Sequence, residues 1–550
     1  MKKLIFIATI FLSTLNSFSQ TPNWAWAKNK GNSYAYAVTT DVFGNVYLVG
    51  ITSGGISFGT DTIPNPGMLI VKYNASGNVI WAKEESNWVY AKCVVTDALG
   101  NVYVAGTFSG TSTSSTVIIG SDTLTNAGGA TYTQDIFVAK YDSNGNEIWA
   151  KSAGNIGNDW ATSISIDGFG NLYVSGGYTS ATLTIGSTTL TNAGSYDFFI
   201  AKYNNLGNAI WAKSGGSNSD DYSTSVISDA IGNVYMTGYF MSPNITFGST
   251  TLNNAGNFDM FIVKYDNNGN VLWASRAGST NEERGNAVSL DAAGNVYLGG
   301  WFYSPAITIG TTLLNNTSTL SNDLFLIKYD SNGNVIWAKS AGGNQFDELT
   351  SIVTNANGNT FITGGYSSPS LLFSGSDTLI NNSSTGNWDV FIAKYDVNGN
   401  VVWAKSIGGI SIEVACSITV DTLEDIYTVG YFQSPSVVFD STTLIKSGLS
   451  SNDMYFAKIG SLPVEISETS DQFKISIYPN PFTSQTTISF SEQQINTTIK
   501  ITDILGQVIT TIHFTGRQLV IDKAEMKAGI YFVQTTDEKK NVTNKKIIIQ

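Results

Sequence analysis

The sequence DIFVAKYDSNGNEIWAK, residues 135–151, predicts two β-strands joined by a tight turn. On both sides of the turn, large apolar residues alternate with small or polar ones, which is the pattern of strands rather than helices. The turn itself, Asp142–Asn146, contains the Asn-Gly pair that hairpins favour. The same unit recurs at residues 197–213, 259–275, 323–339 and 389–405, with a degenerate copy at 68–83.

A second repeated element is a turn of the form Asp-x-x-Gly-Asn between two further strands. It begins at Asp41, Asp97, Asp167, Asp229 and Asp291, with weaker copies at Asn355 and Asp421. The chain therefore contains seven units of four strands. The tryptophans of their Trp-Ala-Lys segments recur every 55 to 68 residues, at Trp26, Trp81, Trp149, Trp211, Trp273, Trp337 and Trp403. Four-stranded units of this length are typical of β-propeller blades.

The two ends of the repeat region predict how the ring closes. The seventh unit has a third strand at residues 453–458 but no fourth strand after it. An unpaired copy of the fourth strand lies at residues 24–28, before the first complete unit. We therefore expect an all-β, seven-bladed β-propeller over residues 20–460, closed by its N-terminal strand.

Length and charge limit what else the chain can be. A chain of 550 residues exceeds a single core, so a second domain is expected. Residues 1–19 combine Lys2 and Lys3, a short apolar run and a small-residue cleavage site, which predicts a signal peptide; no later apolar run is long enough to span a membrane. Residues 20–462 carry 18 basic and 33 acidic side chains, so nucleic acid is a poor partner.

The repeat ends at residue 460, and residues 461–472 are interpreted as a linker. Residues 473–550 alternate like short strands, at 473–478, 486–490, 498–503, 508–513, 518–521, 531–536 and 546–549. So many strands in so short a segment predict a small immunoglobulin-like β-sandwich.

Both regions resemble known families. The pattern Asp-x-Phe-x-x-Lys-Tyr through Trp-Ala-Lys, followed by Asp-x-x-Gly-Asn-x-Tyr, resembles the bacterial β-propeller repeat family, which is tied to no single reaction. The terminal region is similar to type A sorting domains of the type IX secretion system, through Pro479, Asn480, Pro481, Gly529 and Tyr531. That resemblance implies handling by the type IX machinery, passage across the outer membrane, and either release or attachment at the cell surface.

Histidine chemistry is excluded from the propeller. The only histidine, His513, lies in the terminal region, so neither a Ser-His-Asp triad nor the usual zinc sites can form among the repeats. Cys93 and Cys416 fall in different units and are expected to be inert. The Asp-x-Asn-Gly-Asn turns lack the Gly and the distal Glu of a calcium loop, so hairpin turns explain them better. No metal site or cofactor is predicted.

The candidate ligand residues lie at the end of the units that carries the longer connections. The position eight residues before the Asp-x-x-Gly-Asn turn is acidic in five units, at Asp159, Asp221, Glu283, Asp347 and Glu413. These carboxylates either cap loop amides or form a partial ring that binds a cation or a basic or hydroxyl-rich ligand. Aromatic residues on the same side either pack between blades or stack on sugars, and the candidates are Trp160, Tyr239, Trp301 and Trp388.

Three functions are compatible with these features. We expect a secreted or surface-exposed binding module for a glycan or a protein, and not an enzyme. A polysaccharide-degrading enzyme that uses paired carboxylates is the alternative from a different class. A purely structural or adhesive role is the third possibility.

Overall fold

The computed structural model describes residues 21–111, 113–129, 132–373, 377–383, 386–448, 452–460, 475–503, 508–523, 526–527, 529–537 and 542–549. The predicted signal peptide and linker lie outside these residues. The chain divides into two compact units, Met1–Ser461 and Leu462–Gln550. In the described part of the chain, no helix has the length and apolarity that a membrane crossing requires.

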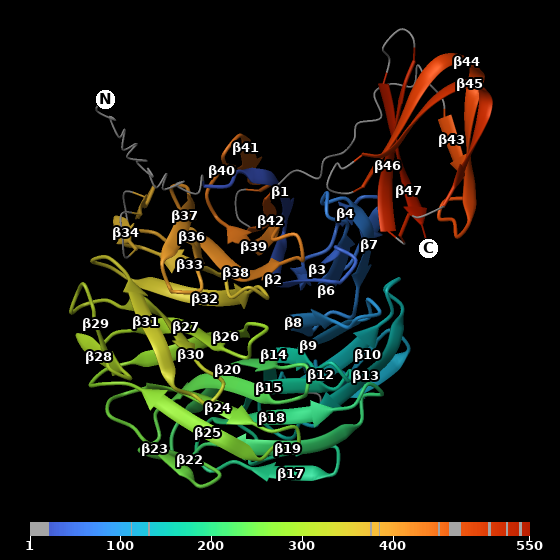
Figure 1. The fold of residues 1–550 in the computed structure, drawn as a ribbon. Helices are drawn as coiled ribbons and strands as arrows, with labels where there is room; N and C mark the ends of the chain where they lie inside the picture. Colours follow the sequence, from blue (N-terminus) through green and yellow to red (C-terminus); the bar gives the residue numbers. More distant parts are fainter. Residues whose placement is uncertain are drawn as a thin grey trace, which may run out of the picture. The chain divides into compact units, whose positions relative to one another are not determined.

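The first unit consists of seven four-stranded antiparallel sheets arranged as the blades of a ring (Figure 1). The strands of each blade are given from the centre outward. Blade 1 contains β2 (Ser33–Thr40), β3 (Val46–Thr52), β6 (Gly67–Tyr73) and β7 (Val79–Glu84). Blade 2 contains β8 (Val89–Thr96), β9 (Val102–Ser109), β12 (Gln134–Tyr141) and β13 (Glu147–Ala153). Blade 3 contains β14 (Asp159–Ile166), β15 (Leu172–Tyr178), β18 (Asp197–Tyr203) and β19 (Ala209–Gly215).

The remaining blades repeat this arrangement. Blade 4 contains β20 (Asp221–Ser228), β21 (Val234–Phe240), β24 (Asp259–Tyr265) and β25 (Val271–Ala277). Blade 5 contains β26 (Glu283–Leu290), β27 (Val296–Phe302), β30 (Asp323–Tyr329) and β31 (Val335–Ala341). Blade 6 contains β32 (Asp347–Thr354), β33 (Thr360–Tyr366), β36 (Asp389–Tyr395) and β37 (Val401–Ile407). Blade 7 contains β38 (Glu413–Val420), β39 (Ile426–Phe432), β42 (Asp453–Ile459) and β1 (Trp24–Gly31).

The N-terminal strand completes blade 7, as the repeat pattern predicts. Strand β1 pairs antiparallel with β42, and Trp26 lies opposite Lys458. In blade 2 the equivalent pair is Trp149 opposite Lys140, so β1 occupies the register of an ordinary fourth strand. The predicted seven-bladed propeller, closed by its N-terminal strand, is confirmed.

The repeated motif residues hold neighbouring blades together. Trp81 Nε1 of blade 1 and Lys72 Nζ of the same blade both donate to Ser143 O in the hairpin turn of blade 2, at 3.1 and 3.0 Å. The glycine of that turn, Gly145, has a φ of 80° and lies against the Trp81 ring, where a Cβ atom would come within 3.1 Å of ring carbons. A side chain there would strain the backbone and clash with the ring, so only glycine fits.

The turn aspartates cap their own turns. Asp142 Oδ1 accepts hydrogen bonds from the amides of Asn144 and Asn146, each at 2.8 Å. In the other repeated turn, Asp41 makes the same contacts and also accepts from Tyr47 Oη at 3.0 Å. These bonds account for the Asx residues of both turns without a cation. Among the described residues, no group of three or more Asp, Glu, His or Cys side chains could hold a metal ion.

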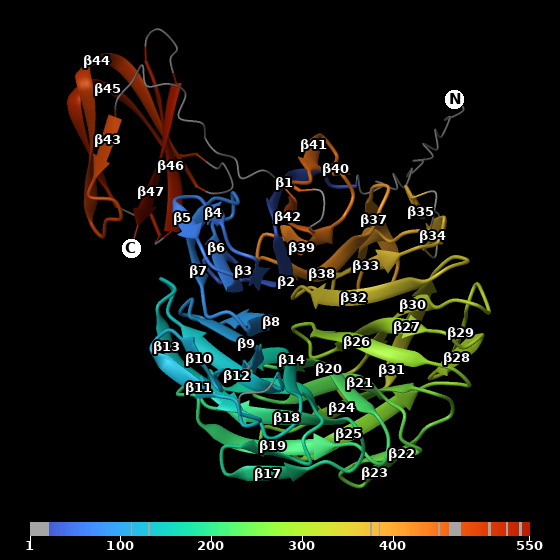
Figure 2. The same cartoon turned by 180° about the vertical axis from the view of Figure 1, so that it is seen from behind.

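The connection between the second and third strands of each blade is more ordered than a loop. It folds into a two-stranded hairpin that packs against the outermost strand of its blade, at the rim of the ring (Figures 1 and 2). Leu183, Ile185 and Leu190 of one hairpin are buried in the blade core. The seven hairpins are β4 (Ile56–Phe58) with β5 (Asp61–Ile63), β10 (Thr116–Ile119) with β11 (Asp122–Thr125), β16 (Thr182–Ile185) with β17 (Thr188–Thr191), β22 (Asn244–Phe247) with β23 (Thr250–Asn253), β28 (Ala306–Ile309) with β29 (Thr312–Asn315), β34 (Ser370–Leu372) with β35 (Thr378–Ile380), and β40 (Ser436–Phe439) with β41 (Thr442–Ile445).

The second unit is a single curled sheet with its own core. It contains β43 (Ile475–Tyr478), β44 (Gln485–Asp503), β45 (Val508–Asp522), β46 (Gly529–Thr536) and β47 (Val542–Ile549). The sequence predicts seven short strands here, but the described residues form five longer ones. The reason is that β44 and β45 pair along most of their length, with irregular register between Ser489 and Thr497. That irregularity lets one end of β44 pair with β43 and the other with β46, so the sheet curls around Ile488, Ile499 and Val533.

Candidate functional site

The two faces of the propeller differ in their connections. The Asp-x-x-Gly-Asn turns, and the turns between the third and fourth strands of each blade, lie on one face, here called the turn face. The innermost strands of the blades begin on the opposite face, here called the loop face, where the longer connections also lie. The candidate ligand residues all belong to the loop face, because they lie near the start of a first or third strand or the end of a second strand.

The five predicted carboxylates do not form an open ring. Each is the first residue of its innermost strand and is 0% exposed. Asp159 Oδ2 accepts from Asn155 N at 2.9 Å and from Ser180 Oγ at 2.7 Å, and so ties together the two connections that meet at its blade. Asp221 and Asp347 accept the equivalent bonds from a loop amide and a serine hydroxyl. Glu283 and Glu413 accept from a loop amide and from the amide of the corresponding serine. Of the two interpretations, the observed bonds are those of caps on loop amides, and no oxygen of the set faces solvent in this structure.

A second set of buried carboxyl groups lies next to this one. The first aspartate of the third strand, Asp135 in blade 2, is 1% exposed and accepts a bond from Ala127 N at 2.6 Å. Its Oδ1 has no partner among the described residues. Burial raises the pKa of Asp135 to about 7, and the neighbouring Asp159 adds to the effect. Burial likewise raises the pKa of Asp197 and Asp389 to about 6 each.

Each innermost strand contains a β-bulge at its fourth residue. The extra residue is a threonine in three blades, and its hydroxyl contacts the next blade: Thr224 Oγ1 donates to Gly285 O at 2.6 Å. Thr162 and Thr350 make the same contact, and Asn286 makes one through its amide. The bulge residue is thus a linking group between neighbouring blades.

Three consecutive blades depart from this rule. The bulge residue is Cys416 in blade 7, Tyr36 in blade 1 and Lys92 in blade 2. Lys92 Nζ lies 4.2 Å from the centroid of the Tyr36 ring. Burial raises the pKa of the Cys416 thiol to about 12, so it is neutral and unreactive at physiological pH. The blade contact explains threonine at this position but not these three residues.

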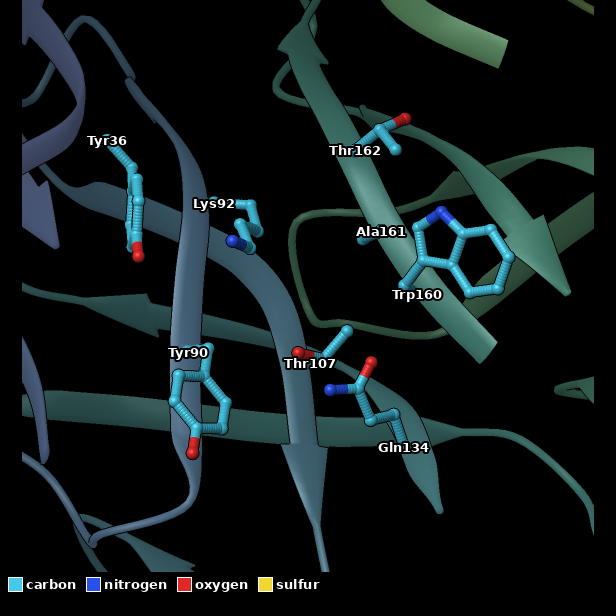
Figure 3. Close-up of a pocket in the computed structure, with 8 residues that line it drawn as sticks. All are labelled: Tyr36, Tyr90, Lys92, Thr107, Gln134, Trp160, Ala161 and Thr162. Atoms are coloured by element: carbon cyan, nitrogen blue, oxygen red, sulfur yellow. The ribbon is translucent and has the colours of Figure 1, made fainter. Parts of the chain in front are cut away.

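A pocket of about 510 Å³ opens beside these residues. Figure 3 shows Tyr36, Tyr90 and Lys92 on one side of it and Trp160 on the other. This pocket, here called the Lys92 pocket, is lined by Tyr36, Tyr90, Lys92, Thr107, Gln134, Trp160, Ala161 and Thr162. Three aromatic rings, one ammonium group and several neutral hydrogen-bonding groups therefore meet in one cavity.

Aromatic side chains continue from this pocket across blades 3 to 5. From Trp160 to Phe258 successive ring centroids lie 4.9 to 5.7 Å apart, and Trp301 is joined to these rings through Arg284. This aromatic arc consists of Trp160, Tyr196, Tyr222, Tyr239, Phe258 and Trp301. Arg284 joins its last three members, with its guanidinium carbon 4.6 Å from the Tyr239 centroid and 5.0 Å from that of Trp301. Arg284 also forms an ion pair with Glu282 at 3.1 Å.

The arc ends at a second pocket, of about 260 Å³, between blades 4, 5 and 6. This Trp301 pocket is lined by Asn257, Asn281, Glu282, Trp301, Tyr303, Asn322, Phe346 and Glu348. Asn322 is 1% exposed; its Nδ2 donates to Glu348 Oε1 at 3.1 Å, and its Oδ1 has no partner among the described residues. Burial raises the pKa of Glu348 against the opposing effects of Asn322 and Arg284.

The four predicted aromatic residues fall in different places. Trp160 lines the Lys92 pocket and Trp301 lines the Trp301 pocket. Tyr239 lies between them in the aromatic arc. Trp388 lines neither pocket and packs over Gly365, where a Cβ atom would lie 2.6 Å from its ring. Sequence reasoning missed Lys92, Tyr36 and the carboxamides of the Trp301 pocket.

The motif residues of the terminal unit fasten its loop to its last strand. Asn480 Nδ2 donates to Lys546 O at 2.8 Å, and Ile548 N donates to Asn480 Oδ1 at 2.8 Å. Pro479 O accepts from Thr486 Oγ1 at 2.6 Å. Gly529 begins β46, and Tyr531 Oη donates to Lys527 O at 3.0 Å. Pro481 lies between these contacts, in the segment that is outside the sheet.

Comparison with known proteins supports the assignment of the terminal unit. Residues 476–550 match the family described as the secretion system C-terminal sorting domain. A 78-residue segment, 14% of the chain, is 37% identical to part of an endo-acting ulvan lyase of Formosa agariphila and covers 15% of that protein. A longer alignment of 380 positions, which covers 56% of the chain, shows 27% identity to an uncharacterized WD repeat-containing protein, L264, of Acanthamoeba polyphaga mimivirus, and covers 27% of that protein. The chain thus spans less than a third of these curated relatives.

Among solved structures, the Neurospora crassa Pan2 WD40 domain aligns with 78% of the chain and 89% of its own length, at a TM-score of 0.36 and 9% identity. Membership of the bacterial β-propeller repeat family stays a prediction. The match of residues 476–550 to the sorting-domain family identifies the route by which the protein is exported. The chain is therefore a β-propeller protein with a C-terminal sorting domain, exported by type IX secretion across the outer membrane to the cell surface or the exterior.

Proposed function

We propose that the propeller binds carbohydrate on its loop face, outside the cell, with a sugar ring docking in the Trp301 pocket. The observation that carries this proposal is the composition of the pocket. Trp301, Tyr303 and Phe346 provide aromatic surface, and three asparagines and two glutamates surround it. Aromatic rings stack on the apolar faces of sugars, while carboxamides and carboxylates bind pairs of hydroxyl groups.

The hydrogen-bonding state of Asn322 supports the same proposal. Its buried Oδ1 has no partner among the described residues, although its Nδ2 is held by Glu348. A buried acceptor without a donor is costly. A sugar hydroxyl in the pocket would supply the missing donor, while Glu348 and Asn281 would accept or donate to its neighbours.

A glycan array probed with the full-length chain tests the proposal, followed by titration of any glycan retained. Phe346 is 44% exposed and can be truncated with little loss of packing, whereas Trp301 is 8% exposed. We expect Phe346→Ala to weaken binding about tenfold, the loss of one stacking contact. Phe169→Ala is the control, because Phe169 is 67% exposed on the turn face. Absence of any retained glycan, or equal binding by both variants, would contradict the proposal and leave a protein-binding or adhesive role.

A second candidate function follows from the two carboxylates of the same pocket. Burial raises the pKa of Glu348, and Glu282 is ion-paired with Arg284. Glycoside hydrolysis uses one carboxylic acid and one carboxylate in different environments. Release of reducing ends from a retained glycan, abolished in Glu348→Gln with binding preserved, would favour a hydrolase. Retention without release in both proteins would favour the binding module.

A further inference from the structure

The Lys92 pocket contains a charge that the fold does not need. Lys92 occupies the bulge position where Thr162, Thr224 and Thr350 link their blades. A threonine there would restore the contact that the other blades make. The fold therefore explains the bulge but not the lysine.

The ammonium group of Lys92 has no acidic partner. Within the described residues, no Asp or Glu oxygen lies within 4.0 Å of its Nζ, and none of the residues that line the pocket is acidic. The nearby thiols, Cys93 and Cys416, are neutral because burial raises the pKa of each to about 12. The Tyr36 ring is the group that faces the charge, at 4.2 Å. An electron-rich ring stabilises a cation only in part, so the charge remains available to an anion.

We infer that the Lys92 pocket binds an anionic sugar unit, one that carries a carboxylate or a sulfate, and this inference rests on the proposed carbohydrate-binding role. Tyr36, Tyr90 and Trp160 supply stacking surface around the ammonium, and Thr107 and Gln134 supply hydroxyl and amide groups (Figure 3). The cavity, at about 510 Å³, is within the size range of small-ligand sites. The anionic group pairs with Lys92 while the ring lies against the aromatic side chains.

The overall negative charge of the protein limits which anions bind. The net charge of −13 opposes the approach of a densely charged polyanion. At physiological ionic strength, charges farther away than about 8 Å are largely screened, so Lys92 dominates inside its pocket. The Lys92 side chain remains in contact with solvent. Partial burial lowers the pKa of Lys92, and a bound anion would raise that pKa again. Oligosaccharides with isolated anionic groups are therefore the preferred ligands.

Calorimetric titration of the full-length chain with matched oligosaccharides tests this inference. A tetragalacturonate with a single free carboxylate is compared with its full methyl ester, which lacks the carboxylate charge, and carrageenan tetrasaccharides are compared with unsulfated agarose tetrasaccharides. We expect the acidic member of at least one pair to bind about 10- to 100-fold more tightly, as one charged hydrogen bond contributes. Lys92→Thr should remove that preference and leave the neutral member unaffected, and Lys92→Arg should retain it. Lys213→Thr, at an exposed lysine of the outermost strand β19, is the matched control.

The outcomes separate this inference from the proposed function. If neutral and acidic members bind equally and Phe346→Ala weakens both, the Trp301 pocket binds sugar and the inference about Lys92 is wrong. If the acidic member binds more tightly but Lys92→Thr changes nothing, the anion site lies elsewhere and the inference is also wrong. If no oligosaccharide binds, both proposals fail. Loss of the acidic preference in Lys92→Thr alone, with the urea midpoint of the variant unchanged, supports the inference.

Discussion

Replacing Asp135 by asparagine should change how the stability of the propeller depends on pH. The Asp135 carboxyl is 1% exposed, and burial raises its pKa from an ordinary value of 3.8 to about 7. A pKa that is raised in the folded state contributes stability below the unfolded value, and this is lost as the pH rises through the folded value. The wild-type chain should therefore lose stability between pH 5 and pH 8.

The magnitude follows from the size of the shift. Each pKa unit corresponds to about 1.4 kcal/mol, and between pH 5 and pH 8 the unfolded carboxyl is already ionised while the folded one becomes so. Asp135 alone should then cost the wild type about 3 kcal/mol over this interval. Asparagine has nearly the same shape and cannot ionise. The free energy of unfolding of Asp135→Asn relative to wild type should rise by that amount between pH 5 and pH 8.

Urea unfolding followed by tryptophan fluorescence measures this difference, because all 12 tryptophans lie in the propeller and none in the terminal unit. Asp142→Asn is the control. Burial alone would raise the pKa of Asp142, but hydrogen bonds from Asn146 and Asn144 outweigh it and hold the pKa below its usual value. Any stability that Asp142 contributes is lost only under acidic conditions, so this variant should run parallel to wild type from pH 5 to pH 8. If Asp135→Asn also runs parallel to wild type, the buried carboxyl is not protonated in the folded state and the reasoning fails.

Three further predictions concern the contacts between blades, the closure of the ring and the export of the protein. Trp211→Phe removes the bond from Trp211 Nε1 to Asn267 O and should lower the free energy of unfolding by about 1 kcal/mol. Trp26→Phe is the control and should cost less, because the buried Trp26 Nε1 has no partner among the described residues. Equal urea midpoints for the two variants would contradict this prediction. Deletion of residues 24–31 leaves β42 without its outer partner and should broaden the unfolding transition, and a transition as sharp as that of the full chain would show that closure is dispensable. Deletion of residues 476–550 should keep the protein out of the medium and off the cell surface, as measured by immunoblots of cell fractions beside the full-length chain, and an exported truncation would show that another segment directs export.

The architecture was predictable because the motif residues are themselves the contacts between blades. Trp81, Lys72 and Gly145 recur in sequence since each must meet its counterpart in the next blade, so their period reveals the blades directly. The rim hairpins were missed although a signal existed. Leu183 and Ile185 alternate with threonines before a glycine, which is a strand pattern too short to stand out beside the longer repeats.

The candidate site was harder to predict. The carboxylates of the innermost strands could be found from spacing, but their burial depends on loop amides such as Asn155 N, which no side-chain pattern reveals. Lys92 could have been found by aligning the innermost strands and asking which bulge residue departs from threonine. Lys92 and Thr162 each lie five residues before the turn aspartate of their unit, so the spacing aligns them. What the spacing does not reveal is the bulge that turns this position into a contact between blades, because the bulge is a backbone feature without a sequence signature.

The pairing of β1 with β42 also imposes an order on folding. Pairings within blades 1 to 6 join contiguous segments and can form locally, whereas β1 must wait for a partner that is synthesised after every other strand of the ring. Until then, β1 has no partner and presents an unpaired edge to which another chain could add. Only a complete propeller covers this edge, so truncated chains remain prone to aggregation and proteolysis. The N-terminal strand thus makes stability outside the cell conditional on synthesis of the entire ring.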